Sequence, residues 1–270
     1  MERETKTEQQ VEHIEERSTP PTPVIYEIVR RYGEDEMARP AVSLWWSGLA
    51  AGLSMSFSLL ALALLWQHLP EAPWRPLLVA LGYPVGFVMV VLSRQQLFTE
   101  NTITVVLPVM AEPSGRNFWR AGRMWAIVLA ANLAGTLLAA LFVTFTPVVT
   151  PELREAMLEV SRHAMQHGWL EMGFRAITAG FLMAALVWLL PAAEGAQFYV
   201  IFLMTYLIGL ADAAHIIAGS IEGFLLVANG ELGAAAMLGG FTLPVLAGNV
   251  VGGTVLFALL SYAQVMREIG

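Results

Sequence analysis

The chain has no cysteine and almost no lysine, and only 14% of its 270 residues are charged. The absence of cysteine excludes a disulfide framework and a thiolate metal site, and it gives no information on whether the protein works in an oxidising or a reducing compartment. Because Lys6 is the only lysine, the distribution of positive charge has to be followed through arginine. The formal net charge of −7 argues against a nucleic-acid partner.

Apolar residues, in contrast, make up 56% of the chain, which is more than a soluble domain of this length can bury in its own core. The composition therefore predicts an all-α integral membrane protein whose solvent is the lipid bilayer. No secretory signal is expected, because the first 40 residues are polar and the first apolar run is too long for one.

Two parts of the chain are expected: a cytoplasmic N-terminal tail over residues 1–40 and a transmembrane domain over 41–270. Residues 1–23 mix both charge signs and end in a proline-rich stretch, a composition typical of disordered segments. Over residues 25–37 the apolar residues have helical spacing, which fits either a short interfacial helix or a solvated lead-in.

Six hydrophobic segments are each long enough to cross about 30 Å of hydrocarbon. They lie at residues 42–66, 76–110, 124–149, 170–190, 197–228 and 241–265. Ten lysines and arginines lie in the tail, the 111–123 connection and the C-terminus, against three in the other two connections. This asymmetry predicts that both termini are cytoplasmic in a multi-pass protein of the inner (plasma) membrane.

The second and fifth segments are too long for one ordinary crossing, and each is interrupted by polar residues near its middle. The second contains the run 93–102 (SRQQLFTENT), and the fifth contains Asp212, His215 and Glu222. Irregular backbone at membrane depth persists only where it is buried in protein or lines a polar cavity, because lipid cannot satisfy freed N–H and C=O groups. Helices two and five are therefore predicted to be broken.

A weak internal repeat relates the two interruptions. The run Asn132-Leu-Ala-Gly-Thr resembles Asn249-Val-Val-Gly-Gly-Thr, the two asparagines lie 117 residues apart, and the same offset carries Phe98 to His215. The Ala-Gly pairs at 51–52 and 179–180 form a further match at a different offset. With three crossings in each half, the second copy has to enter from the opposite side, which predicts an inverted 3+3 repeat whose broken helices meet near the midplane.

At these residues the sequence resembles the formate/nitrite transporter family, over about residues 35–268. The most specific elements are Leu97-Phe98-Thr99, His215 and the run 248–253 that contains Asn249. The resemblance implies an aquaporin-like fold of six helices and a homopentamer with one pore in each subunit. It also implies that Leu97, Phe98 and Thr99 form a constriction and mobile loop facing His215, and that Asn249 belongs to the polar lining of the pore.

The chain departs from the usual pattern of that family at several positions. Gln96 and Glu100 flank the Leu-Phe-Thr tripeptide where an acidic residue and a glycine are usual, and Arg94 stands where glycine is usual. Ala214 precedes the central histidine in place of glutamate, and the usual lysine before helix four has no equivalent. We therefore infer a divergent branch of the family.

The pore chemistry implied is passage of a small monovalent anion or its conjugate acid. An apolar pore rejects a naked anion because desolvating a charge is costly, whereas the neutral acid crosses easily. His215 would attract the anion, hand it a proton or stabilise it transiently, Thr99 and Asn249 would donate hydrogen bonds, and Leu97 and Phe98 would form a dry gate. The alternatives are a buried histidine satisfied by a backbone carbonyl, and a threonine and asparagine that break helices or join neighbouring helices through side-chain hydrogen bonds.

Five charged residues fall at membrane depth: Arg94, Glu100, Arg175, Asp212 and Glu222. Unpaired charges there are expensive, so mutual pairing in a structural role is expected, with Asp212 favoured as the partner of Arg94. In the functional alternative, Arg94 or Arg175 adds positive potential that attracts anions to the pore.

Two other functions stay open from the sequence: an aquaporin-like conduit for small neutral solutes, and a non-conducting membrane scaffold or sensor. The paired Asn-Pro-Ala motifs of aquaporins are absent. An enzyme, a metal site and a cofactor are not expected, because no metal-ligand spacing and no nucleophile–base motif occur. The residues leave open which anion passes, in which direction, and whether passage is channel-like or proton-coupled.

Overall fold

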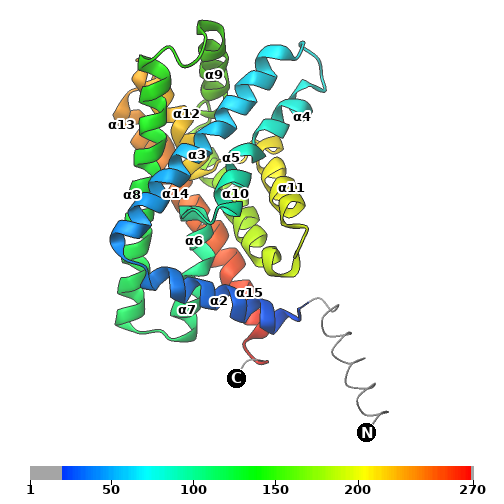
Figure 1. Ribbon diagram of the computed structural model, residues 1–270, viewed down its shortest axis with the longest axis vertical. Coiled ribbons are helices and arrows are strands. Elements are labelled where there is room, and N and C mark those ends of the chain that lie inside the picture. The colour runs from blue at the N-terminus through cyan, green and yellow to red at the C-terminus, as the bar shows by residue number, and fades with distance from the viewer. Residues whose placement is uncertain (1–19, 269–270) are drawn as a thin grey trace.

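The computed structural model describes residues 20–268, and within that range every regular element is a helix (Figure 1). Of the polar tail expected over residues 1–23, residues 1–19 lie outside the described part. The chain enters it through α2 (Thr22–Ala38), which contains the segment 25–37 whose apolar residues have helical spacing. A tight turn at Arg39 and Pro40 separates α2 from the first apolar helix.

Five helical stretches are long and apolar enough to cross a membrane. They are α3 (Ala41–His68), the stretch Arg75–Leu92, α8 (Gly115–Phe145), the stretch Trp169–Ala192 and the stretch Ala234–Val265. The second comprises α4 (Arg75–Val79), η1 (Ala80–Gly82) and α5 (Pro84–Leu92), and the fourth comprises α10 (Trp169–Leu189) and η2 (Leu190–Ala192). The last comprises α13 (Ala234–Ala236), η3 (Met237–Thr242), α14 (Leu243–Val250), η4 (Val251–Ala258) and α15 (Leu259–Val265).

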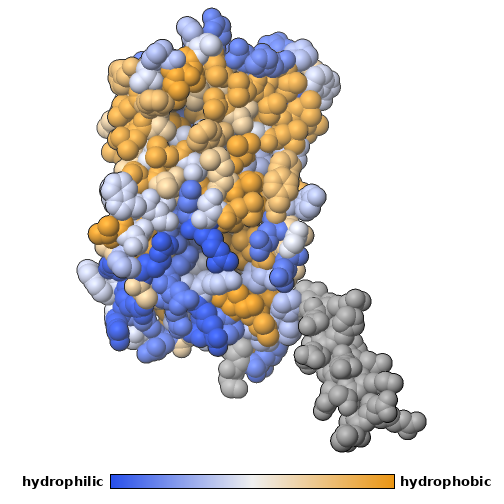
Figure 2. All heavy atoms as spheres, in the orientation of Figure 1, coloured by the Kyte–Doolittle hydropathy of each residue, from blue (hydrophilic) through white to orange (hydrophobic). Residues whose placement is uncertain are grey.

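Shorter helices complete the described part: α6 (Phe98–Thr104), α7 (Val106–Ala111), α9 (Pro151–Ala164), α11 (Gln197–Leu210) and α12 (Ile216–Ala228). Helices α2, α7 and α15 lie at one end of the molecule, and α9 and α13 lie at the opposite end (Figure 1). We call these the α2 end and the α9 end. An apolar belt covers the surface between them, and polar surface gathers at both ends, more extensively at the α2 end (Figure 2).

The two interruptions expected from the sequence are both present as non-helical backbone. One separates α5, which ends at Leu92, from α6, which begins at Phe98; the other separates α11 from α12. Each contains one non-glycine residue with positive φ, Arg94 at 53° and Asp212 at 50°. These left-handed residues turn the chain sharply, so that each resumed helix starts from a buried extended residue, Leu97 or His215.

The offset between the two interruptions is 118 residues, one more than between the two asparagines. Arg94 matches Asp212 and the helix-capping Leu97 matches His215 at that offset. The sequence-based pairing of Phe98 with His215 is therefore wrong by one residue, because the segment before the second asparagine is one residue shorter. The residue that caps each resumed helix, Leu97 in the first half and His215 in the second, defines how the two halves of the chain align.

Close helix pairs frame the interruptions. A Cβ atom at Gly52 of α3 would lie 2.2 Å from the carbonyl oxygen of Asn132 in α8, and one at Gly180 of α10 would lie 2.2 Å from that of Asn249 in α14. The backbones of each pair can approach this closely only because glycine has no side chain. The matched Ala-Gly pairs of the sequence thus occupy equivalent contacts.

Two connections are more helical than the sequence predicted. Helix α8 begins at Gly115, nine residues before the expected span, since Ser114 caps it by accepting a hydrogen bond from the N–H of Asn117. The 150–169 connection contains α9, whose cap is Thr150 with Pro151 as its first residue. Hydropathy alone missed both because these turns carry arginine and glutamate outside the apolar belt.

Candidate pore site

His215 caps the N-terminus of α12 and is almost entirely buried, with 1% of its surface exposed. Its Nδ1 accepts hydrogen bonds from the backbone N–H groups of Ile217 at 3.3 Å and Ala218 at 3.2 Å. Because Nδ1 is an acceptor, the neutral ring carries its hydrogen on Nε2. That hydrogen is donated to Oγ1 of Thr99, 2.8 Å away.

Thr99 lies in the first turn of α6 and has no exposed surface. Since its oxygen accepts from His215, its own hydroxyl hydrogen is left to donate, and within residues 20–268 it has no acceptor. The edge of the Phe87 ring packs against the imidazole at a centroid distance of 4.9 Å. The two interruptions, far apart in the sequence, are therefore joined by one polar contact in an apolar setting.

Asn249 of α14 braces the second interruption. Its Oδ1 accepts from the N–H of Ile216 at 2.8 Å, and its Nδ2 donates to the carbonyl oxygens of Ala176 at 2.8 Å and Ala214 at 3.0 Å. Both amide hydrogens of Asn249 are therefore already donated, and none is left for the hydrogen bond that was expected to a ligand. The helix-bracing alternative describes the geometry of Asn249 better.

Asn132 of α8 braces the first interruption in the same way. Its Oδ1 accepts from the N–H of Phe98 at 2.9 Å, and its Nδ2 donates to the carbonyl oxygens of Gly48 and Gln96, each at 2.8 Å. The sequence comparison noted Asn132 as half of the repeat but did not propose it as a site residue. The repeat itself was the signal, because a residue equivalent to Asn249 should perform an equivalent task.

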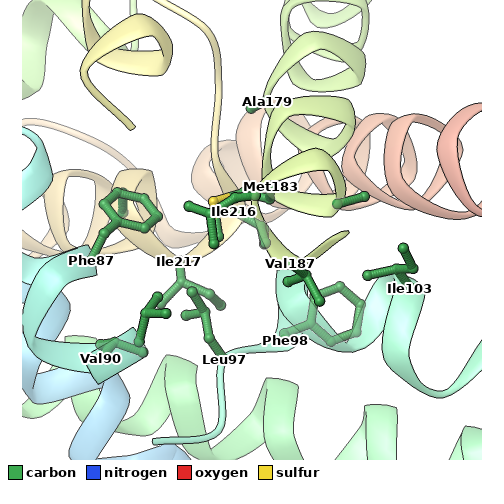
Figure 3. Packing of buried hydrophobic residues seen from close by; sticks show 14 of the residues in the cluster. Phe87, Val90, Leu97, Phe98, Ile103, Ala179, Met183, Val187, Ile216 and Ile217 are labelled. Carbon is green, nitrogen blue, oxygen red and sulfur yellow. The ribbon is translucent and has the colours of Figure 1, made fainter. Parts of the chain in front are cut away.

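Leu97 and Phe98 lie in the apolar cluster between the two interruptions (Figure 3). They are fully or almost fully buried, and the cluster also contains Ile216, Ile217 and Val187. Apolar side chains thus fill the space on the α2 side of the contact between Thr99 and His215. We call this group of side chains the apolar layer, and the gate expected of Leu97 and Phe98 stays a prediction.

A cavity of about 330 Å³ opens on the α9 side of this layer and reaches His215. Its titratable lining residues also include Tyr83, His163, His167, Asp212 and Glu222. His163 lies on α9, and His167 follows it in the connection to α10. Sequence reasoning missed both histidines, because the connection was interpreted as a plain loop.

A second cavity, of about 410 Å³, lies on the α2 side. Its lining includes Arg94 and Gln96 from the first interruption, Glu100 from α6, and Glu36 and Arg39 from the α2 region. His215 does not line it, so the apolar layer separates this cavity from the histidine. The arrangement is two cavities that each contain charged side chains, of which the α9-end cavity reaches His215 and the other does not.

The charges predicted at membrane depth divide between the two cavities. Arg175 donates to Oδ2 of Asp212 at 2.7 Å and to its backbone oxygen at 2.9 Å, and it also pairs with Glu171. The favoured partnership of Arg94 with Asp212 is not formed, because the two interruptions open toward opposite ends. The Arg94 guanidinium lies instead 5.6 Å from the centre of the Tyr32 ring, with no carboxylate partner within residues 20–268.

Glu36 is a further acidic residue of the α2-end cavity that sequence reasoning missed. Its carboxylate accepts from Gln96 Nε2 at 3.0 Å and from Thr104 Oγ1 at 2.8 Å. Burial raises the pKa of Glu36, while these two hydrogen bonds oppose the shift. Its spacing of seven residues from Val29, on the buried face of α2, was the available signal.

Long apolar helices, two interruptions braced by asparagines, and two cavities separated by an apolar layer together define a channel-like membrane protein. A family model described as formate/nitrite transporter matches residues 23–263. The chain belongs to the formate/nitrite transporter family. Within residues 20–268 no group of three or more histidines and carboxylates is placed to hold a metal ion.

Among known proteins, the chain is 45% identical over 245 residues to inner membrane protein YfdC of Escherichia coli (strain K12), covering 91% of this chain and 79% of YfdC. It is 27% identical over 157 residues to formate channel FocA of Haemophilus influenzae, covering 56% of this chain and 54% of that protein.

Solved structures share the fold at low identity. A structure described as a pentameric formate channel with formate bound has a TM-score of 0.71 at 19% identity, covering 84% of this chain and 98% of the other. One described as an FNT family ion channel has a TM-score of 0.72 at 20% identity, covering 90% and 98%.

Proposed function

We propose that this protein is an inner-membrane channel or transporter for small monovalent anions, of the size of formate or nitrite, or their conjugate acids. The observation that carries the proposal is the buried contact between Thr99 and His215, beside the apolar layer that separates the two cavities. Membership of the family supports it, as do the descriptions of YfdC as an inner membrane protein and of FocA as a formate channel.

The architecture proposed with this function has six crossings, the second over 75–111 and the fifth over 197–228, both broken in the middle. An inverted 3+3 repeat of aquaporin-like form accounts for the equal hydrogen bonds at Asn132 and Asn249 and for the opposite openings of the two interruptions. Likeness to a channel described as pentameric supports a homopentamer with one pore in each subunit. Native mass spectrometry in mild detergent tests that state, and monomers or dimers alone would contradict it.

Both termini are proposed to face the cytoplasm. The first described helix, α2, and the last, α15, lie at the same end of the molecule (Figure 1). Arg116, Arg120 and Arg123 fall in the first turns of α8, beside α7 at that end. Positive charge beside apolar spans favours the cytoplasmic side. On this interpretation residues 1–40 form the cytoplasmic part, with α2 at the membrane interface, and 41–270 form the transport domain.

The role proposed for His215 follows from its hydrogen bonds. Its ring hydrogen already belongs to Thr99, and a second proton on Nδ1 would cost the two backbone N–H bonds that cap α12. The ring therefore assists by polarising Thr99, whose free hydroxyl hydrogen donates to an oxygen of the permeating species. Leu97 and Phe98 close the apolar layer on the α2 side, and Asn249 holds the interruption in place.

Flux into proteoliposomes tests the proposal, with formate, nitrite and hydrosulfide compared against glycerol and with empty liposomes as the leak control. His215→Phe removes both the cap and the contact with Thr99, and anion flux should be lost. His215→Asn is the matched control for the cap, since asparagine is a good N-cap residue; it should assemble normally and still lose flux. Thr99→Val should lose flux as well.

The alternatives predict different results in the same assay. Glycerol flux with no anion flux would favour a conduit for neutral solutes, and no flux of any solute would favour a membrane scaffold. Anion flux at the wild-type rate in both His215→Asn and Thr99→Val would contradict the role given to the contact.

A further inference from the structure

Each cavity contains a carboxyl group, buried or partly buried, that forms no ion pair within residues 20–268. Glu222 of α12 lines the α9-end cavity with 8% of its surface exposed, and within residues 20–268 it forms neither a hydrogen bond nor an ion pair through its side chain. Glu100 of α6 lines the α2-end cavity, and its Oε1 is buried without a hydrogen-bond partner in the same range. A buried polar group without a partner is costly and marks a functional candidate.

The arginines predicted as partners do not meet these two glutamates. Arg175 is occupied by Asp212 and Glu171, and Arg94 points toward Tyr32. Both arginines are also more exposed than Glu222, which lies deep in its cavity. Each cavity therefore has an arginine at or beside it and a deeper carboxyl group in front of the apolar layer.

An anion entering either cavity is attracted by the arginine and then meets the carboxyl group. If that group is ionised it repels the anion, and if it is protonated it offers a hydrogen. The ring of His215 is a poor alternative source of a proton, because its only hydrogen is held by Thr99 and its Nδ1 caps α12. The proton that neutralises the anion has to come from another group on the path.

The charged neighbours of each carboxyl group influence the pH range over which that group is protonated. Glu100 shares its cavity with Asp35, Glu36, Arg39 and Arg94. Glu222 shares its cavity with Tyr83, His163, His167, Asp212 and His215, and Arg175 reaches this group through Asp212. Acidic and basic neighbours occur on both sides, so each site can exchange protons with the water of its cavity.

We propose that Glu100 and Glu222 are the proton-exchange groups of the pore, one on each side of the apolar layer. This inference rests on the proposed function. In the entry cavity the O–H bond of the glutamic acid breaks, and its proton forms an O–H bond on a carboxylate or nitrite oxygen, leaving glutamate ionised. The neutral acid crosses beside Thr99 and returns the proton to the ionised glutamate on the other side. Water in the entry cavity then reprotonates the first glutamate, and the second glutamic acid releases its proton to the water of the exit cavity, so that both groups return to their starting states.

The net reaction moves one anion together with one proton, in either direction, and no redox partner is involved. Passage is therefore electroneutral, and the chemical class of permeant is the monovalent anion of a weak acid. Anions of strong acids, which cannot take a proton from a carboxyl group, are excluded by the same step.

Formate flux and internal pH are measured together in proteoliposomes containing the intact oligomer, with membrane potential clamped by potassium and valinomycin. Wild-type protein should move one proton per formate at a rate independent of potential. Glu100→Gln and Glu222→Gln should each lower formate flux at least tenfold, because the amide keeps the shape but cannot exchange a proton. Glu194→Gln, an exposed change in the connection before α11, should leave flux unchanged.

Assembly of each variant is checked by size-exclusion chromatography. If a glutamine variant fails to assemble, the aspartate variant replaces it, and Glu100→Asp or Glu222→Asp should keep one proton per formate at a reduced rate. Wild-type rates with one proton per formate in both glutamine variants would overturn the inference, as would potential-driven formate flux without proton movement in the wild type. Failure of the proposed function is distinct: the wild type would then carry no formate, nitrite or hydrosulfide.

Discussion

The brace at Asn249 allows a stability prediction to be worked from the structure. Asn249→Leu keeps the approximate volume and removes three buried hydrogen bonds, one accepted from Ile216 and two donated to Ala176 and Ala214. Hydrogen bonds inside membrane proteins contribute about 0.6 kcal/mol on average and about 1.7 kcal/mol at most. Three of them give about 2–5 kcal/mol. The expected loss in melting temperature is on the order of 5–15 °C.

The assay is thermal unfolding of the detergent-solubilised protein, followed by fluorescence-detected size exclusion. Asn132→Leu is the matched partner, since it removes the same three kinds of bond at the other interruption, and the two losses should agree within about 1 kcal/mol. Asn229→Leu, which removes one bond to Thr144 and one to its own helix, should have the smaller effect. An unchanged melting temperature in Asn249→Leu would refute the stabilising role of Asn249. A large loss in only one of the two variants would refute the structural equivalence of Asn132 and Asn249.

Four further substitutions test other parts of the structure. Arg175→Gln should lower thermal stability because it removes the arginine partner of Asp212, which then keeps only its contacts with His167 and His163. Arg94→Gln should change thermal stability by less than about 0.5 kcal/mol and reduce anion flux at low salt, and equal stability losses in the two variants would contradict the assignment. Burial raises the pKa of Glu36 above its usual value of 4.5, so the folded state binds the carboxyl proton more tightly than the unfolded state does. Stability against unfolding therefore falls as pH rises from 4.5 through the raised pKa, and Glu36→Gln should flatten that slope in melting curves across pH. Gly253→Ala should impair folding, since its Cβ would lie 2.1 Å from a side-chain oxygen of α6, and normal expression and melting would contradict this close packing.

The apolar spans and the positions of both interruptions were predictable from the sequence, because lipid imposes a strict length and polarity on any crossing. Charged residues such as Arg94 and Asp212 inside long apolar runs are tolerated only where the helix breaks or a cavity admits water. Helix α9 was not predictable in this way, because an amphipathic helix at the surface has the polarity of a loop. Its cap at Thr150 and Pro151 was present in the sequence and was the only indication.

The contact between Thr99 and His215 was expected only through the resemblance and the repeat, and composition alone would not have joined these residues. The partner of Arg94 could not be found by counting charges. Which carboxylate an arginine meets depends on the end toward which each interruption opens, and that depends on the left-handed turns at Arg94 and Asp212. The one-residue error in the register has the same cause, since a capping position is a property of backbone conformation and not of hydropathy.

The equivalence of the two interruptions also accounts for the tolerance of the unusual charges in this chain. Asn132 and Asn249 satisfy the backbone groups at the ends of the interruptions, so the resumed helices keep their positions whatever side chains precede them. Arg94 and Asp212 stand before the braced segments, in water-accessible cavities, where a charge costs far less than within the apolar layer. On the proposed function, divergence in the cavities can therefore change which ions enter and how protons are exchanged, while the contact between Thr99 and His215 stays the same.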